Sequence, residues 1–271
     1  GQQYLGPYTA CMLGEYFMYR GGHVLVVLDD LTKHAWTYRQ ISLLLERAPG
    51  REAYPGDIFY IHSQLMERAA NLKPELKGGS MTFFPIIETL QGDLTSFIPN
   101  NIVSMTDGQI FFDSALFYKG IKPAVDFGLS VSRIGNKAQW KGMRKHSKDV
   151  RLQYLQYQEL LQMTRLRTSG LSEDAKARLR KGEIITQLLG QDKYKPVSLV
   201  AEIMYLIALN HGMFDALTSA SIKRFKEEIF QFVNDKNPKL IEDIVSTHDV
   251  TDENEEQLGE AFLEFLEQIV E

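Results

Sequence analysis

The chain of 271 residues is poor in cysteine, in net charge and in long apolar runs. Its one cysteine, Cys11, allows no disulfide within the chain, and a lone thiol favours a reducing compartment. The formal net charge is -5 at pH 7, which gives no electrostatic reason to expect a nucleic-acid partner. The most apolar stretch, 199–209, carries Glu202 and is shorter than the roughly 18 residues that a membrane helix needs.

Two further absences concern the start of the chain and nucleotide chemistry. The sequence begins at Gly1 without a methionine or a signal-peptide pattern, and its first residues already predict a helix that leads into a strand. Domains seldom begin in this way, so we expect the chain to be the later part of a longer protein. The phosphate-cradling motif G-x-x-x-x-G-K-[ST] is missing, so a nucleotide site built from these residues alone would be incomplete.

The first half of the chain alternates helical segments with short apolar strands. Helices are expected at 8–19, 33–47 and 58–72, and strands at 24–29, 81–89, 101–106, 108–113 and 124–133. Helices mixed with very apolar strands predict an α/β domain whose sheet is covered on both faces.

From about residue 135 onward the sequence shows helical periodicity and no convincing strand. In the last segment, for example, Leu258, Phe262 and Phe265 recur at three- and four-residue steps. Helices are expected at 137–163, 172–190, 197–210, 219–234, 238–246 and 253–271. We therefore predict an α/β domain over 1–135, followed by an all-α domain over 136–271.

The apolar strand at 24–28 ends on two carboxylates, Asp29 and Asp30. A carboxylate at the C-terminal end of a buried strand lies where α/β sheets bind ligands. It can hold Mg²⁺, usually through water, beside a nucleotide phosphate. For an isolated match, the favoured alternative is that the two aspartates cap the following turn.

A second strand, in "DFGLSVSRIG" (126–135), ends on the polar cluster Ser130, Ser132 and Arg133. A planar guanidinium at a strand end can reach a phosphate. Offered to the nucleotide of a neighbouring subunit, it would act as an arginine finger, which contributes on the order of 10³–10⁵ in rate. On spacing alone, the favoured alternative is a salt bridge to a carboxylate such as Glu88 or Asp107.

Three motifs follow one another: "PGREAYPGD" (49–57), "IVSMTDGQIF" (102–111) and "SVSRIG" (130–135). With the sequence around them, they closely resemble the alpha subunits of F-type ATP synthases, most strongly from Gly14 to Gly135. The segment "LLGQDKYKP" (188–196) extends the resemblance to the C-terminal helical domain of that family. The resemblance implies a partial RecA-like P-loop NTPase domain plus a C-terminal helical bundle, with the N-terminal barrel and the P-loop upstream of Gly1.

The resemblance also implies roles for particular residues. Arg133 matches the arginine that reaches into the catalytic site of the beta subunit, Ser130 and Ser132 belong to its motif, and Ser104 and Asp107 match positions that support this interface. Asp29 matches the Walker B aspartate beside Mg²⁺. The other nucleotide-binding positions are Glu88, Phe117, Lys122, Pro123 and Gln191. Lys122 replaces the usual arginine and Lys193 replaces a glutamine, so the affinity or selectivity of this site is expected to differ.

By the same resemblance, the chain would bind ATP or ADP with Mg²⁺ at non-catalytic sites and assist proton-driven ATP synthesis or hydrolysis, without activity on its own. Its partners would be beta subunits in an alternating hexamer, the gamma central stalk near the turn at 167–175, and the delta or peripheral stalk through the upstream part. No nucleic-acid partner is expected. The location would be peripheral, on the cytoplasmic face of a bacterial inner membrane or on a mitochondrial inner or thylakoid membrane.

Three alternatives stay open at this stage. A related hexameric RecA-type motor, such as a termination helicase or an export ATPase, would share the strand-end aspartate and the trans arginine. A truncated relative that assembles without binding nucleotide would be a pure interaction module. In an unrelated α/β plus α protein, Asp29 and Arg133 would lie at strand ends by coincidence.

Overall fold

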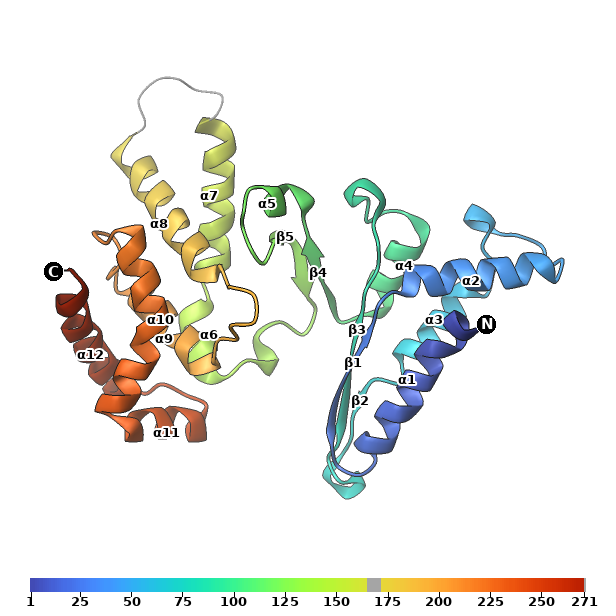
Figure 1. Cartoon of the computed structure of the whole chain (residues 1–271), viewed down its shortest axis with the longest axis horizontal. Helices are drawn as coiled ribbons and strands as arrows, with labels where there is room; N and C mark the ends of the chain where they lie inside the picture. The colour runs from blue at the N-terminus through green and yellow to red at the C-terminus, as the bar shows by residue number, and fades with distance from the viewer. Residues whose placement is uncertain (165–171, 271) are drawn as a thin grey trace. The chain divides into compact units, whose positions relative to one another are not determined.

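The computed structural model describes residues 1–164 and 172–270. Contacts within the chain divide it into two compact units, Gly1–Gln109 and Ile110–Glu271 (Figure 1). This division precedes the predicted boundary at residue 135. The reason is that strand β4 (Gly108–Phe112) pairs only with β5 (Val125–Ser132) among the described strands, and β5 packs against a helix of the second unit.

The first unit combines a small sheet with four α-helices. The sheet has the order β1-β3-β2, with β1 (His23–Leu28) parallel to β3 (Ser80–Pro85) and β2 (Ala70–Asn71) antiparallel to it. The helices are α1 (Gln2–Met18), α2 (Leu31–Leu44), α3 (Ile58–Met66) and α4 (Phe97–Met105). Parallel pairing aligns Leu28 with Pro85, so β1 and β3 end at the same edge of the sheet.

One face of this sheet is covered and the other is not, within the described residues. Val26 and Leu28 of β1 are buried in a core that also holds Cys11, Met18 and side chains of α2 and α3. The alternate residues Leu25 and Val27 are 58% and 53% exposed. The expectation of a sheet covered on both faces is therefore wrong for this part of the chain.

The expected strand at 101–106 is also wrong, because these residues form most of α4. The β-branched residues of "NIVSMT" suggested a strand, but Ile98 and Ile102 are buried four residues apart, on one face of a helix. Pro99 lies in the first turn, where a missing amide hydrogen costs nothing.

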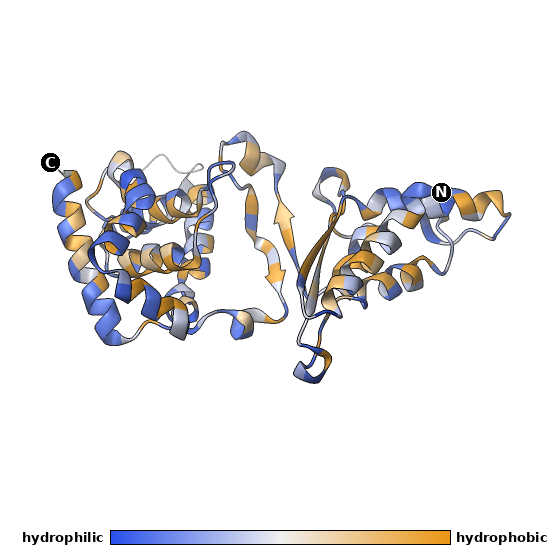
Figure 2. Ribbon diagram, turned by 60° about the horizontal axis from the view of Figure 1, so that its bottom comes forward, coloured by the Kyte–Doolittle hydropathy of each residue, from blue (hydrophilic) through white to orange (hydrophobic). Residues whose placement is uncertain are grey.

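The second unit holds the β4–β5 pair and the helices that follow. These helices are α5 (Ser114–Tyr118), α6 (Lys141–Ser147), α7 (Val150–Thr164), α8 (Glu173–Leu189), α9 (Leu199–Asn210), α10 (Ser219–Lys236), α11 (Pro238–Thr247) and α12 (Asp252–Val270). The expected helix at 137–163 is thus two helices. The strands and the helices of this unit both carry hydrophobic residues interleaved with hydrophilic ones (Figure 2).

A large apolar core organises the helical part. Helix α9 is buried on most of its surface, and Phe225 of α10 makes edge contacts with Phe214 and Phe262 at ring-centroid distances of 5.0 and 5.6 Å. The predicted sequence of a partial α/β domain followed by an all-α domain is confirmed. None of the described helices combines the length and the apolar content that crossing a membrane requires.

Candidate functional site

The first group of candidate residues lies at the edge of the sheet where β1 and β3 end. The Ile86 amide donates to the Leu28 carbonyl, and the Leu31 amide donates to the Ile86 carbonyl, each at 3.0 Å. These bonds hold the two strand ends together. Asp29 and Glu88, which follow the two strands, are both exposed at this edge.

The two aspartates after β1 have different surroundings. Asp30 caps α2, because its carboxylate accepts hydrogen bonds from the backbone N–H of Lys33 at 2.7 Å and from the Lys33 ammonium at 2.5 Å. Burial raises the pKa of Asp30, but these hydrogen bonds outweigh it and hold the pKa below its ordinary value. The capping interpretation is therefore right for Asp30, while the exposed Asp29 stays a candidate ligand.

The Lys33 ammonium interacts with the carboxylates at this edge of the sheet, Asp29, Asp30 and Glu88, which we call the acidic edge. Its pKa is raised first by the hydrogen bond to Asp30, and the negative charges of Asp29 and Glu88 add to that effect. The backbone N–H of Glu88 donates to the buried hydroxyl of Thr32 at 3.0 Å, which fixes where the chain leaves β3. The structure thus brings Asp29 and Glu88 into one electrostatic neighbourhood.

The donor set at this edge fits a magnesium ion that is shared with a ligand. Among the described residues, no group of three or more His, Cys, Asp or Glu side chains has the arrangement to hold a metal alone. Mg²⁺ usually keeps several waters and takes only one or two carboxylates, together with phosphate oxygens of the substrate. Asp29, with Glu88 nearby, matches that requirement.

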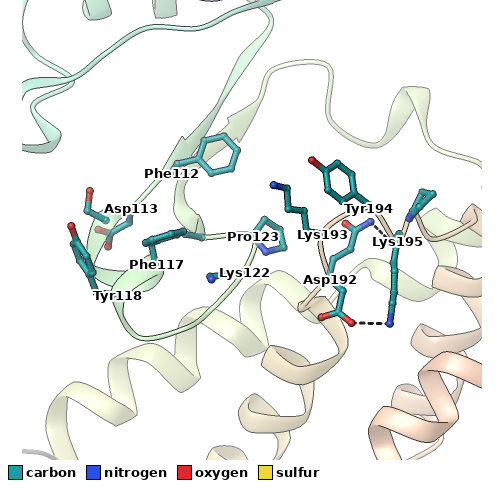
Figure 3. Close-up of a pocket in the computed structure, with 14 residues that line it drawn as sticks. Phe112, Asp113, Phe117, Tyr118, Lys122, Pro123, Asp192, Lys193, Tyr194 and Lys195 are labelled. Carbon is teal, nitrogen blue, oxygen red and sulfur yellow. Dashed lines mark hydrogen bonds and ion pairs between the residues drawn. The ribbon is translucent and has the colours of Figure 1, made fainter.

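The second group forms a pocket of about 970 Å³ in the second unit (Figure 3). One wall comes from the end of β4, from α5 and from the loop before β5. The other wall is the loop between α8 and α9. The lining residues are Phe112, Asp113, Ser114, Phe117, Tyr118, Lys122, Pro123, Ala124, Gln191, Asp192, Lys193, Tyr194, Lys195 and Pro196.

Four of the residues predicted by resemblance to bind nucleotide line this pocket: Phe117, Lys122, Pro123 and Gln191. The backbone N–H of Gln191 donates to the backbone carbonyl of Lys122 at 2.8 Å, and this hydrogen bond connects the two walls. The Lys122 ammonium lies 5.0 Å from the centre of the Phe117 ring, a cation–π distance. An aromatic and aliphatic lining with a few polar groups suits a planar, partly polar ligand.

Lys226 of α10 holds the start of the α8–α9 loop. Its ammonium donates to the carbonyls of Gln187 and Gly190 at the end of α8, directly before Gln191. Burial lowers the pKa of Lys226, and nearby carboxylates such as Asp192 oppose that effect. A salt bridge of 3.2 Å between Lys195 and Asp192 braces the outer part of the loop (Figure 3).

Sequence reasoning missed several aromatic residues of the pocket. Phe112, Tyr118 and Tyr194 line it, and Tyr194 is 87% exposed with the Lys193 ammonium 4.7 Å from its ring centre. The position of this tyrosine between two lysines in "DKYKP" was a signal available in the sequence. Phe112 gave no such signal, because it ends an apolar strand.

The third group surrounds Arg133, which is exposed immediately after β5. The Ser130 hydroxyl accepts the Phe111 amide of β4 at 2.9 Å, so it acts within the strand pair. The Ser132 hydroxyl accepts the Gly135 amide at 3.1 Å and closes the turn that follows. Both serines therefore hold backbone on either side of Arg133.

The remaining predicted residues lie in the first unit. Ser104 is exposed near the end of α4, where its hydroxyl donates to the Asn101 carbonyl at 2.6 Å, and Asp107 is exposed between α4 and β4. Of the turn at 167–175, expected near the central stalk, residues 167–171 lie outside the described part of the chain. The acidic edge belongs to the first unit and the pocket to the second.

Comparison with known proteins gives two family matches and a set of similar sequences. The nucleotide-binding domain of the ATP synthase alpha/beta family matches residues 1–132, and the C-terminal domain of the ATP synthase alpha/beta chain matches residues 139–265. ATP synthase subunit alpha from Clostridium botulinum strain Eklund 17B / Type B is 47% identical over 263 residues, which are 97% of this chain and 52% of that protein. The same protein from strain Alaska E43 / Type E3 gives the same values. The chain spans about half the length of the curated relatives it matches.

Proposed function

The chain belongs to the ATP synthase alpha/beta family as a homologue of the alpha subunit, and from this we propose that it binds ATP or ADP at a non-catalytic site and offers Arg133 to the catalytic site of a neighbouring beta-type subunit. In this role it assists proton-driven ATP synthesis, or ATP hydrolysis, as part of a complex. Alone it would be inactive. The relatives are named as ATP synthase subunits, which favours this function over the motor and helicase alternatives.

The observation that carries the proposal is the setting of Arg133. The residue is exposed, and the backbone on both sides of it is held by the hydroxyls of Ser130 and Ser132. A held backbone reduces the reordering that the guanidinium needs in order to meet a phosphoryl group. It would stabilise the negative charge that spreads over the transferring phosphoryl group. Ser104 and Asp107 would support the same interface from the first unit.

The aromatic pocket supports nucleotide binding by this chain. Phe117, Lys122, Pro123 and Gln191 would surround the base, and the missed rings Phe112 and Tyr194 would enlarge the stacking surface. With Lys122 and Lys193, the pocket would be more cationic than a pocket that carries glutamine at the position of Lys193. We therefore expect a higher affinity for ATP than for adenosine.

The acidic edge supports binding of the magnesium that accompanies the nucleotide. Asp29 would hold Mg²⁺, with Glu88 as a second carboxylate nearby. When bound, the ion neutralises charge on the nucleotide phosphates. Asp30 is committed to the α2 cap and would not serve as a ligand.

The partners follow from the same proposal. The chain would alternate with beta subunits in a hexamer around a gamma stalk, with a delta or peripheral stalk bound through sequence that the curated relatives have beyond this chain. The complex would hold it at the face of a bacterial inner membrane or an organellar membrane. No nucleic-acid partner is proposed.

The test is the turnover of the complex assembled with its beta-type partner. We expect R133A to lower kcat for ATP hydrolysis by on the order of 10³, the lower end of the range for such arginines, while the complex still assembles. R133K keeps the charge but not the planar fork, so it should recover only part of the rate. The matched control is R224A, which removes an exposed arginine of α10 that pairs with Glu228. An R133A complex with unchanged kcat would refute the proposed role.

A further inference from the structure

Two charged side chains hold the backbone of β5 shortly before Arg133. Arg151 of α7 donates from Nε to the Phe127 carbonyl and from Nη2 to the Ser130 carbonyl, each at 3.1 Å. On the same strand, Oδ1 of Asp126 accepts the amides of Gly128 at 2.7 Å and Leu129 at 3.0 Å. One guanidinium and one carboxylate thus fix four consecutive residues, 127–130, through main-chain atoms.

These contacts mark an irregular point in the strand. In a regular strand, successive amides point to opposite sides, so one carboxylate oxygen cannot accept two in a row. A local irregularity of this kind bends a strand and redirects the side chains after it, as a β-bulge does. The path of the backbone through residues 126–129 therefore affects where the backbone of Arg133 lies.

The connection from this point to Arg133 is short and held at each step. Ser130, whose carbonyl is bound by Arg151, also accepts the Phe111 amide through its hydroxyl. Ser132 then closes the turn at Gly135. Little freedom is left between the Arg151 guanidinium and the Arg133 backbone, so a shift at residues 127–130 is passed on to Arg133.

Packing between β5 and α7 also includes an apolar contact. The Phe127 ring contacts the Tyr154 ring of α7 edge-on at a centroid distance of 5.1 Å. This apolar contact can keep the strand on the helix when the guanidinium is removed. What Arg151 adds is the alignment of two carbonyls three residues apart, which an apolar contact does not provide.

We propose that Asp126 and Arg151 are positioning residues for Arg133, which act by fixing the backbone of β5 at residues 127–130 and hence the place from which the Arg133 guanidinium reaches the partner's nucleotide. The inference rests on the proposed role of Arg133. Neither residue was singled out by the motifs in the sequence, because each acts on backbone atoms.

The experiment measures ATP hydrolysis by the complex assembled with its beta-type partner. R151M keeps much of the side-chain length without donors, and we expect it to lower kcat about tenfold to a hundredfold, with KM nearly unchanged, because misplacement by about 1 Å can cost on the order of a hundredfold. R151K should recover part of this loss, since one ammonium can reach one carbonyl but not both in a fork. D126A should resemble R151M, and D126N, which keeps the accepting oxygen, should recover most of what D126A loses.

A double-mutant cycle separates positioning from a structural effect. If Arg151 acts through Arg133, R151M should cause no further loss of kcat in an R133A complex. An equal loss in both backgrounds would overturn the inference and leave the role of Arg133 intact. Unchanged turnover in R133A alone would instead refute the proposed function, and the inference with it.

Assembly is the remaining control. Recovery of the complex by size-exclusion chromatography should match the wild type for R151M and for D126A. If R151M does not assemble, D126A carries the same test through the other half of the contact. Failure of both variants to assemble would assign the pair to folding and would overturn the inference.

Discussion

The two units of this chain are stabilised in different ways. In the first unit, large apolar side chains such as Met12, Leu13 and Leu25 are exposed, while His34 and His62 are buried. The second unit encloses one larger apolar core in its helices, and its buried polar residues, among those described, are His146 and Asn254. The comparison teaches that the pocket belongs to the unit with the larger core, whereas the acidic edge belongs to the unit whose smaller core is joined by a pair of buried histidines.

The first unit buries a pair of histidines in contact with each other. His34 Nδ1 lies 3.2 Å from His62 Nε2, and the Tyr4 ring stacks on His34 at a centroid distance of 5.1 Å. Burial, with a smaller contribution from the charge of His34, lowers the pKa of His62 to about 3. The folded first unit therefore requires a neutral histidine pair.

Each unit has its own optical reporter, because the chain has two tryptophans. Trp36 lies on α2 in the first unit, and Trp140 precedes α6 in the second, where its ring stacks on His248. The variants W140F and W36F thus report the unfolding of the first and of the second unit separately.

The largest effect is expected from F225A in the core of the second unit. Removing a buried ring that contacts Phe214, Phe262 and Phe265 should lower the free energy of unfolding by about 3–5 kcal/mol. Urea titration should show this loss in the Trp140 signal and leave the Trp36 midpoint in place. If both signals shift together, the two units unfold as one and the comparison fails.

The next effect is a pH dependence of the first unit. Because folding lowers the pKa of His62 from its ordinary value near 6.5 to about 3, the unfolded chain binds more protons than the folded chain in this window. Stability that is present above pH 6.5 should be lost as the pH falls, by up to about 1.4 kcal/mol per pH unit for this group. The Trp36 midpoint should fall with pH, and H62M, which removes the titrating group, should flatten that dependence. An equally steep H62M profile would assign the acid sensitivity to other groups.

A smaller effect should separate the ligand-binding contributions of the two units. F117A should weaken the binding of both ATP and adenosine about tenfold, since stacking on an aromatic ring is worth roughly 1–3 kcal/mol per base. D29A should weaken MgATP and leave adenosine unchanged, because it removes only a metal ligand. Isothermal titration calorimetry measures the affinities for MgATP and for adenosine. The control is L152A, which changes an exposed leucine. A loss of adenosine binding in D29A would show that the effect of this variant is not limited to the metal.

The smallest effect is a gain in the second unit. Gly259 lies within α12, and an added Cβ would meet no atom within 4 Å. G259A should therefore raise stability by about 0.5–1 kcal/mol in the Trp140 signal. G182A is the contrasting variant, because its Cβ would lie 2.0 Å from the Tyr157 ring, so it should destabilise. A gain in stability in both variants would mean that the packing of α7 against α8 rearranges at little cost to make room for the added methyl group.

The sequence predicted the parts of this molecule that depend on local patterns. The run Val24–Leu28 made β1 evident, and helical spacing located α8 to α12 to within a few residues. The strand expected at 101–106 failed because β-branched residues also fit a helix when buried neighbours recur every fourth residue. Sheet order and the uncovered sheet face depend on long-range contacts that no local pattern encodes.

The candidate site divides in the same way. Motifs identified Phe117 and Gln191, far apart in the chain, as parts of one pocket, and this came from resemblance rather than from spacing. Lys226 was missed because it supports the loop beside the pocket from a neighbouring helix, and Tyr194 was missed although its place between two lysines was a signal. The assignment of Asp30 to the cap and of Asp29 to the exposed edge required the hydrogen bonds of Lys33.

The contacts of Asp126 and Arg151 reach only main-chain atoms of β5. Leu129 and Val131, both partly exposed, can therefore be exchanged over evolution without removing any of these four hydrogen bonds. The strand before Arg133 could thus change its exposed side chains while its backbone keeps these hydrogen bonds. If Arg133 acts at an interface with a partner subunit as proposed, such an arrangement would let the two surfaces adapt to each other without a matching change in the chemistry.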